Sequence, residues 1–251
     1  NDWFNPGYTF SRVDATVTAF LKSDAPPASS ENTSLLSADD SDEPVIAWYE
    51  AKSNYVYWYC KAGVKTQSDL SSLFYKFKNI TDVSGVSEWD TSGMQNASSM
   101  FYSCYALENV DALSDWNTSN LTRSSSMFNY CKKLANLNGL SNWDTSNLTN
   151  ISSMFDSCSA LTECRSLKDW DTSNLTSMLN TFNSCYNLTL LDLSNWNLNK
   201  VSNMNAGASF SNAAYTSKAC TIICTKEVEN KLNNTNSGMT TSYFTFVRPA
   251  S

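Results

Sequence analysis

The sequence predicts a mainly β solenoid of about five coils of roughly 26–27 residues each. Cysteines at one repeat position are evenly spaced, and so are tryptophans at another, apart from a last interval that is shorter by one residue. Phenylalanine and leucine keep this period, and a fixed period of roughly 20 to 50 residues is the signature of a repeat architecture. The repeated positions are Trp89, Trp116, Trp143, Trp170 and Trp196; Phe74, Phe101, Phe128, Phe155 and Phe182; Cys104, Cys131, Cys158 and Cys185; and Leu107, Leu134, Leu161 and Leu188.

Within one repeat, single apolar residues are separated by one or two polar residues. No apolar run reaches the roughly 10 to 12 residues of a stable helix, so short strands and turns are expected. One coil cannot bury its own apolar residues, whereas stacked coils can. We therefore expect the repeated tryptophans and cysteines to form buried structural ladders, with like side chains one above another.

The segment Asp/Asn-Thr-Ser-Asn, which follows most of the repeated tryptophans, is the predicted turn of the coil. Asn and Asp side chains bond their own backbone two residues on, and Asn tolerates left-handed geometry. A metal site is the alternative, because Asp144 and Asp171 would stack as adjacent carboxylates and hard cations take oxygen ligands. The neighbouring coils carry Asn117 and Asn197 there, so we expect a structural turn, with no metal and no cofactor.

Residues 1–66 lie before the repeats and are expected to form a β-rich N-terminal cap. A strand is expected around Thr16–Leu21, followed by a long solvated loop over Asp24–Glu43. Alternation and aromatic content predict a β-hairpin over residues 45–60. Such a cap fits the first coil, because a bare terminal coil would expose core and strand edges.

Residues 67–211 form the expected repeat region, and residues 212–251 form the expected C-terminal cap. The cap combines a strand at Cys220–Cys224, a short helix at Lys226–Leu232 and a last strand at Tyr243–Val247. A small cap of mixed helix and strand is therefore predicted at this end.

The string Trp-Asp-Thr-Ser-Asn-Leu-Thr at residues 143–149, with Met-Phe-x-x-Cys at 154–158, resembles a known repeat. It is similar to the 26-residue repeat of bacterial surface proteins, the BspA-like branch of leucine-rich repeats. The likeness covers about Leu70–Phe210. It implies a leucine-rich-repeat-type solenoid, a secreted or cell-surface location, and a role in adhesion or host contact. It carries over no catalytic residue.

Three coils depart from the 26-residue length by one extra residue, which falls in the segments Val110–Leu113, Leu137–Leu140 and Cys164–Leu167. The last coil reads Leu191–Leu193 and lacks it. An extra residue against a stacked neighbour is what a β-bulge accommodates, so bulges are expected in those coils.

Composition excludes several classes of function. The net charge of −7 opposes nucleic acid and anionic membranes as partners. No stretch approaches the roughly 18 apolar residues of a membrane span. The sequence has no histidine, no glycine-rich phosphate loop and no nucleophile elbow, so no enzyme is expected. No signal peptide or wall-sorting tail is visible, and we expect the chain to be part of a larger protein.

The eight cysteines divide into two groups. Four occupy the ladder position and Cys164 takes an apolar place of the repeat, which predicts five buried free thiols behaving as small hydrophobes. Cys60, Cys220 and Cys224 lie outside the ladder, and a disulfide between two of them stays open. The pair Cys220 and Cys224 is disfavoured, because four residues along a strand separate them too far.

The turns that follow each repeated phenylalanine vary from coil to coil and are the predicted binding surface. Tyrosine brings contact area and a polar tip at small entropic cost. The competing surface is the inter-coil strand face, with Glu108, Asp111, Arg165 and Lys168. The candidate binding residues are Tyr102, Tyr105, Tyr130, Lys132, Lys133 and Tyr186.

Together with what the resemblance implies, these patterns favour a non-catalytic bacterial cell-surface module for binding or adhesion, which contacts a host or neighbouring-cell macromolecule. The expected partner is a host or bacterial surface protein or a glycan, with an immunoglobulin or a matrix protein among the candidates. The alternative is a structural spacer or stalk of a larger surface protein. An enzyme is a distant third.

Overall fold

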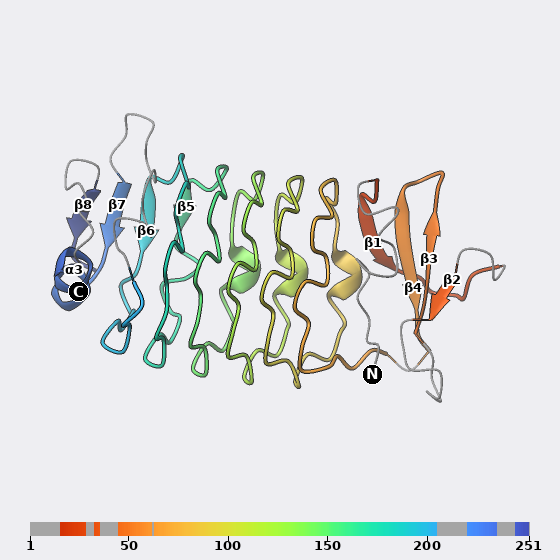
Figure 1. Ribbon diagram of the computed structural model, residues 1–251, viewed down its shortest axis with the longest axis horizontal. Helices are drawn as coiled ribbons and strands as arrows, with labels where there is room; N and C mark the ends of the chain where they lie inside the picture. The colour runs from red at the N-terminus through yellow and green to blue at the C-terminus, as the bar shows by residue number, and fades with distance from the viewer. Residues whose placement is uncertain are drawn as a thin grey trace.

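The protein is elongated, with its repeats side by side along the long axis and a small sheet at each end (Figure 1). The expected boundary between residues 211 and 212, and part of the loop expected over Asp24–Glu43, lie outside the described residues. The computed structural model describes residues 16–28, 33–35, 45–61, 63–204, 220–234 and 244–250.

The prediction of a mainly β, leucine-rich-repeat-type solenoid is wrong. In the described residues, regular strands are two to five residues long and belong to two four-stranded sheets. The repeats between them consist of turns, 3₁₀ turns and isolated parallel bridges. The physical reason lies in the Ser, Thr and Asn residues of each repeat, whose side chains bond nearby backbone and so compete with strand pairing. The chain forms a stack of turn-rich repeats.

The N-terminal sheet has the order β1-β4-β3-β2, with β1 parallel to β4 and the other pairs antiparallel. Strands β3 and β4 form a hairpin whose turn contains Asn54 at a φ of 60°. Strand β2 falls within the segment expected to be a solvated loop, which corrects that expectation. The strands are β1 (Ala19–Lys22), β2 (Thr33–Leu35), β3 (Ile46–Glu50) and β4 (Tyr55–Tyr59).

The C-terminal sheet has the order β5-β6-β7-β8, and all its neighbouring strands are parallel. Helix α3 (Lys226–Asn234) follows β7, and the Thr225 hydroxyl accepts a hydrogen bond from the Val228 amide at 3.3 Å. Its Val228 and Leu232 side chains are buried, so the helix joins the core. The strands are β5 (Glu163–Cys164), β6 (Leu190–Asp192), β7 (Cys220–Ile223) and β8 (Phe244–Val247).

In two of the three longer repeats the extra residue is taken up in a 3₁₀ turn, and the β-bulge expected there is wrong. Turns η2 (Asp111–Leu113) and η3 (Asn138–Leu140) occupy that place, and η1 (Ser84–Val86) is their counterpart in the first repeat. The third segment, Cys164–Leu167, begins at the end of strand β5 and continues as a turn. The last repeat lacks the residue and forms strand β6 instead. Packing is tight: a Cβ on Gly139 would lie 1.9 Å from the Val110 carbonyl oxygen.

Like side chains stack on like along the core. Phenylalanine rings of successive repeats are near parallel, and so are the four indoles from Trp116 to Trp196. Each of these indoles also donates its N–H to a carbonyl of the preceding repeat, at the end of the corresponding turn. The acceptors are Val86 for Trp116 (2.9 Å), Leu113 for Trp143 (3.0 Å), Leu140 for Trp170 (3.0 Å) and Leu167 for Trp196 (2.7 Å).

The cysteines of the ladder position are fully buried, and all eight cysteines are free thiols. Each ladder thiol donates to the carbonyl of the phenylalanine in the preceding repeat, as Cys131 does to Phe101 at 3.2 Å. Burial raises the pKa of the Cys104, Cys158 and Cys185 thiols well above the ordinary value. The ladder therefore holds neutral thiols that act as small apolar groups and weak donors.

Because these thiols are buried, they are expected to react only when the repeats open. Native protein should be alkylated at Cys104, Cys131, Cys158 and Cys185 at least about a thousandfold more slowly than denatured protein. Peptide mapping after timed alkylation, without reductant, measures this ratio. The variant Lys168→Cys is the control, because its exposed thiol should react at the rate of a free peptide. Disulfides among the four ladder cysteines would contradict the assignment.

Candidate binding surface

The turn after each repeated phenylalanine has the same left-handed backbone from repeat to repeat. The left-handed residue lies two positions after the phenylalanine and is Lys76, Ser103, Tyr130, Ser157 or Ser184, with φ between 56° and 66°. Backbone hydrogen bonds link neighbouring turns in register, as from the Ser103 amide to the Asn129 carbonyl at 2.7 Å. Corresponding residues therefore line up along one edge of the stack.

Three tyrosines form a continuous row on this edge. Tyr75 and Tyr102 are stacked, with ring centroids 4.9 Å apart and planes 17° apart. Tyr130 packs against Tyr102 at 5.8 Å with an interplanar angle of 68°. Tyr75 and Tyr130 remain 37% and 39% exposed. Together the rings span three successive repeats.

Tyr130 differs from its flanking repeats because it places a bulky side chain at this left-handed position, with a φ of 62°. The corresponding positions of the flanking repeats hold the small residues Ser103 and Ser157. A bulky residue in this region is uncommon and carries a strain of about 1–3 kcal/mol. Such outliers gather at ligand-binding sites, so Tyr130 is a functional candidate on backbone grounds as well as exposure.

Lysines are interleaved with the tyrosines. The Lys76 ammonium lies 4.9 Å from the centroid of the Tyr75 ring, and that of Lys132 lies 5.1 Å from the Tyr105 ring. The Lys78 backbone carbonyl accepts a hydrogen bond from the Ala106 amide at 3.1 Å. Lys78 therefore lies beside Tyr105, which directly precedes Ala106. The tyrosine–lysine edge is defined as Tyr75, Lys76, Lys78, Tyr102, Tyr105, Tyr130, Lys132 and Lys133.

Asn129 and Asp156 occupy the repeat position of Tyr102 in the next two repeats. Asn129 is 8% exposed, and its Oδ1 has no hydrogen-bond partner. Asp156 is partly buried and accepts from Ser157 Oγ at 2.9 Å and Asn183 Nδ2 at 3.0 Å. Burial raises the pKa of the Asp156 carboxyl, and burial also raises that of the Tyr102 hydroxyl. The tyrosine row therefore ends beside two hydrogen-bond acceptors.

The structure brings five of the six sequence candidates together: Tyr102, Tyr105, Tyr130, Lys132 and Lys133. Tyr186 is exposed but stands two repeats beyond Lys132, with Ser159 at the corresponding place between them.

Sequence reasoning missed Tyr75, Lys76 and Lys78. They lie in the degenerate first repeat, which lacks the cysteine and the Met-Phe pair. The signal that could have found them is the period itself, since Tyr75 precedes Tyr102 by one full repeat.

The competing charged face is largely paired within itself. Arg165 forms an ion pair with Glu163 at 2.9 Å, and Lys168 forms one with Asp169 at 3.6 Å. Glu108 instead reaches the tyrosine–lysine edge through Lys133 at 3.8 Å. Exposed pairs of this kind contribute little stability, about 0–1 kcal/mol each.

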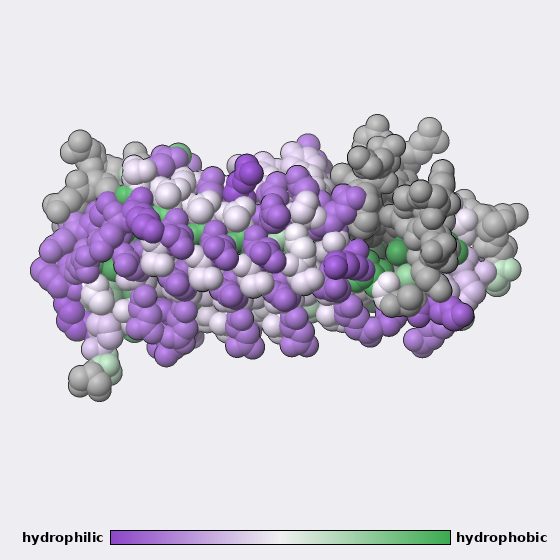
Figure 2. Space-filling model, turned by 90° about the horizontal axis from the view of Figure 1, so that it is seen from below, coloured by the Kyte–Doolittle hydropathy of each residue, from purple (hydrophilic) through white to green (hydrophobic). Residues whose placement is uncertain are grey.

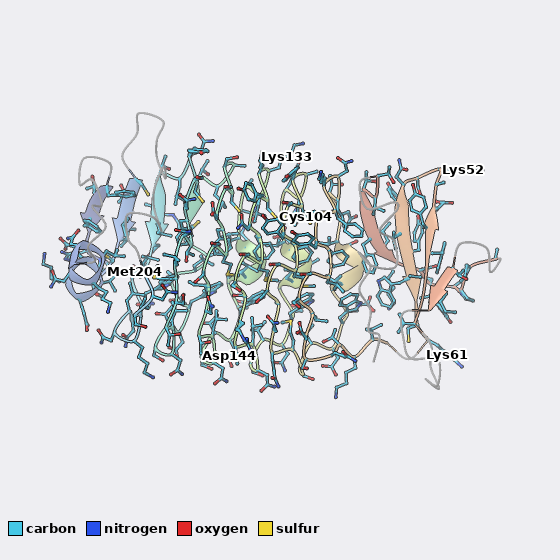
Figure 3. All side chains as sticks on the ribbon, viewed as in Figure 1. Lys52, Lys61, Cys104, Lys133, Asp144 and Met204 are labelled. Atoms are coloured by element: carbon cyan, nitrogen blue, oxygen red, sulfur yellow. The ribbon has the colours of Figure 1, made fainter. Side chains whose placement is uncertain are left out.

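The opposite edge is uniform. Figure 3 places Asp144 on the edge opposite Lys133, and Figure 2 shows that lower edge as mostly hydrophilic. Asp144 Oδ1 accepts a hydrogen bond from the Ser146 amide at 3.0 Å. The side chains of Asp171 and Asn197 likewise accept a hydrogen bond from the amide two residues later. In the part of the chain that the structure describes, no group of three or more acidic or cysteine side chains could hold a metal ion.

These features define the class: a repeat protein with one uniform edge and one variable aromatic edge. The sequence model of a family described as "Mycoplasma protein of unknown function, DUF285" matches residues 68–164 and 133–237, more than half of the chain. The chain therefore belongs to this family. No curated protein matches the chain. None of the described helices is long and apolar enough to cross a membrane.

Proposed function

We propose that this chain is a non-catalytic binding module of a bacterial cell surface, akin to the BspA-like proteins, and contacts a macromolecule of a host or neighbouring cell. The observation that carries the proposal is the tyrosine row of Tyr75, Tyr102 and Tyr130. The row lies on an edge whose residues differ from repeat to repeat, whereas the residues of the core are the same in most repeats.

Repeat scaffolds create specific surfaces by changing exposed positions while the core stays constant. A few aromatic anchors usually carry most of the binding energy at such surfaces. The strained backbone at Tyr130 supports the same edge, because strain persists where the side chain has a use.

The test measures saturable binding of the labelled chain to cultured epithelial cells. Replacing Tyr102, Tyr105 and Tyr130 together by serine is expected to weaken binding by at least about 2 kcal/mol, or roughly thirtyfold. The melting temperature should stay within a few degrees, because these side chains lie outside the core.

The matched control is the double charge swap Asp111→Lys and Arg165→Glu on the competing face. It should bind like the parent chain. If the swap abolishes binding while the tyrosine variant binds normally, the functional face has been misplaced.

A structural spacer is the second candidate, supported by the uniform hydrogen-bonded turns of the opposite edge. On that reading the parent chain shows no saturable binding to cells at any concentration. The binding isotherm of the parent chain therefore separates the two functions before any variant is made.

A further inference from the structure

Positive charge gathers on the tyrosine–lysine edge of an otherwise acidic chain, which has 17 Lys and Arg against 24 Asp and Glu. Four exposed lysines, Lys76, Lys78, Lys132 and Lys133, lie within three successive repeats. Among the described residues, only Lys133 of these four has an ion-pair partner, Glu108, at 3.8 Å. The edge therefore offers ammonium groups whose charge the protein itself leaves largely uncompensated.

Neighbouring side chains already contact the rings of the edge, and Tyr75 and Tyr130 remain 37% and 39% exposed. Tyr75 lies between Lys76 and Tyr102, and Tyr102 lies between Tyr75 and Tyr130. Tyr105 is covered by Lys132. Besides these partly covered rings, the edge offers a partner the hydroxyl groups of the tyrosines and the ammonium groups of four exposed lysines.

This arrangement decides between classes of partner. The core of a protein interface is depleted of lysine, whereas four exposed lysines stand among the tyrosines of this edge. Single-stranded nucleic acid needs free aromatic faces on which bases stack. An acidic polysaccharide needs no stacking surface, because its sulfate or carboxylate groups accept hydrogen bonds directly from ammonium and hydroxyl groups.

The spacing fits a linear polyanion. Neighbouring repeats lie about 4.8 Å apart, so the lysines of the first repeat stand roughly 10 Å from those of the third. That separation is of the order of one disaccharide unit.

We infer that the tyrosine–lysine edge binds an acidic polysaccharide, with lysines and tyrosine hydroxyls holding its anionic groups. The inference rests on the proposed function and names the ligand class of the same edge. Because exposed charges carry the contact, affinity falls as salt rises.

The test titrates the purified chain with heparin for sulfate groups, hyaluronan for carboxylate groups, and neutral dextran as the uncharged control. Heparin, hyaluronan or both should bind, more weakly at high salt, and dextran should not. The combined variant Lys76→Gln, Lys78→Gln, Lys132→Gln and Lys133→Gln should lose at least about tenfold in affinity.

The matched control changes the same net charge elsewhere, with Lys65→Gln, Lys168→Gln, Lys200→Gln and Lys226→Gln. It should keep the parent affinity within about twofold, since distant exposed charges are screened. An equal loss in both variants overturns the inference, because binding then reflects net charge alone. So does failure to bind either polysaccharide, or equal binding of polyglutamate or single-stranded DNA.

The proposed function is tested apart from this. If cell binding needs Tyr102, Tyr105 and Tyr130 but neither heparin nor hyaluronan competes with it, the edge is a binding site for another class of partner. In that case the polysaccharide inference fails and the proposed function stands.

Discussion

Replacing Trp143 by alanine is expected to lower the free energy of unfolding by about 3–5 kcal/mol. The indole is 5% exposed and lies between Trp116 and Trp170, with ring centroids 6.5 and 6.4 Å away. Its removal leaves a cavity in the middle of the stack. It also removes the indole donor of the Leu113 carbonyl, which keeps the Trp116 amide as its donor at 3.3 Å.

The loss should spread to the neighbouring repeats, because each repeat buries its apolar residues against the next. Urea unfolding followed by tryptophan fluorescence measures the change. Trp143→Phe separates the two causes, since it keeps most of the packing and removes only the donor. Lys168→Ala is the surface control and should change stability by less than about 0.5 kcal/mol. A Trp143→Ala protein as stable as the parent would refute the role of the stack.

The period of the sequence was enough to align residues across repeats. Trp116 and Trp143 are one repeat apart, and the structure stacks their rings with planes 8° apart. Alternation and aromatic content likewise predicted a hairpin where β3 and β4 pair. Both signals work because they report directly on which side chains share a surface.

The backbone between the ladders could not be predicted in the same way. Serine, threonine and asparagine suit strands of a stacked coil and also turns that bond their own side chains, and only the packed structure decides between them. The segment Val110–Leu113 was expected to hold a bulge but forms η2, since a 3₁₀ turn absorbs one residue without breaking the contact to the next repeat.

The tyrosine row depended on a detail outside the repeat pattern. Tyr130 lies two residues after its phenylalanine, whereas Tyr75 and Tyr102 follow theirs directly. The left-handed backbone at Tyr130 turns this offset into a ring contact with Tyr102. Neither that contact nor the covering of Tyr75 by Lys76 follows from spacing alone.

Stability is expected to fall steeply as the pH rises above about 8.5, where thiols of an unfolded chain begin to ionise. Burial keeps the pKa of Cys131 and Cys164 above this range, as it does for the other ladder thiols, and raises that of Cys220 to about 12. Above pH 8.5 the unfolded chain therefore releases protons that the folded chain retains. The folded state then binds more protons, so the unfolding free energy decreases with increasing pH.

Each such thiol contributes a slope of about 1.4 kcal/mol per pH unit, and the five thiols of the stack together about 7 kcal/mol per pH unit. This is comparable with the whole stability of a folded domain, about 5–15 kcal/mol. The protein should therefore unfold within about one to two pH units above the thiol range. Below about pH 7 the thiols stay almost fully protonated in both states and contribute almost no slope.

Urea unfolding at a series of pH values, with reductant present, measures the slope directly. Tyrosines ionise in a neighbouring range, so the control is Cys131→Ala, which removes one thiol and leaves every tyrosine in place. Its slope should be shallower by about 1.4 kcal/mol per pH unit, although its stability at neutral pH is lower because Phe101 loses a donor. An unfolding free energy that stays constant up to about pH 10 would contradict the burial of the cysteine ladder, because ionisation of an accessible thiol costs the folded state nothing.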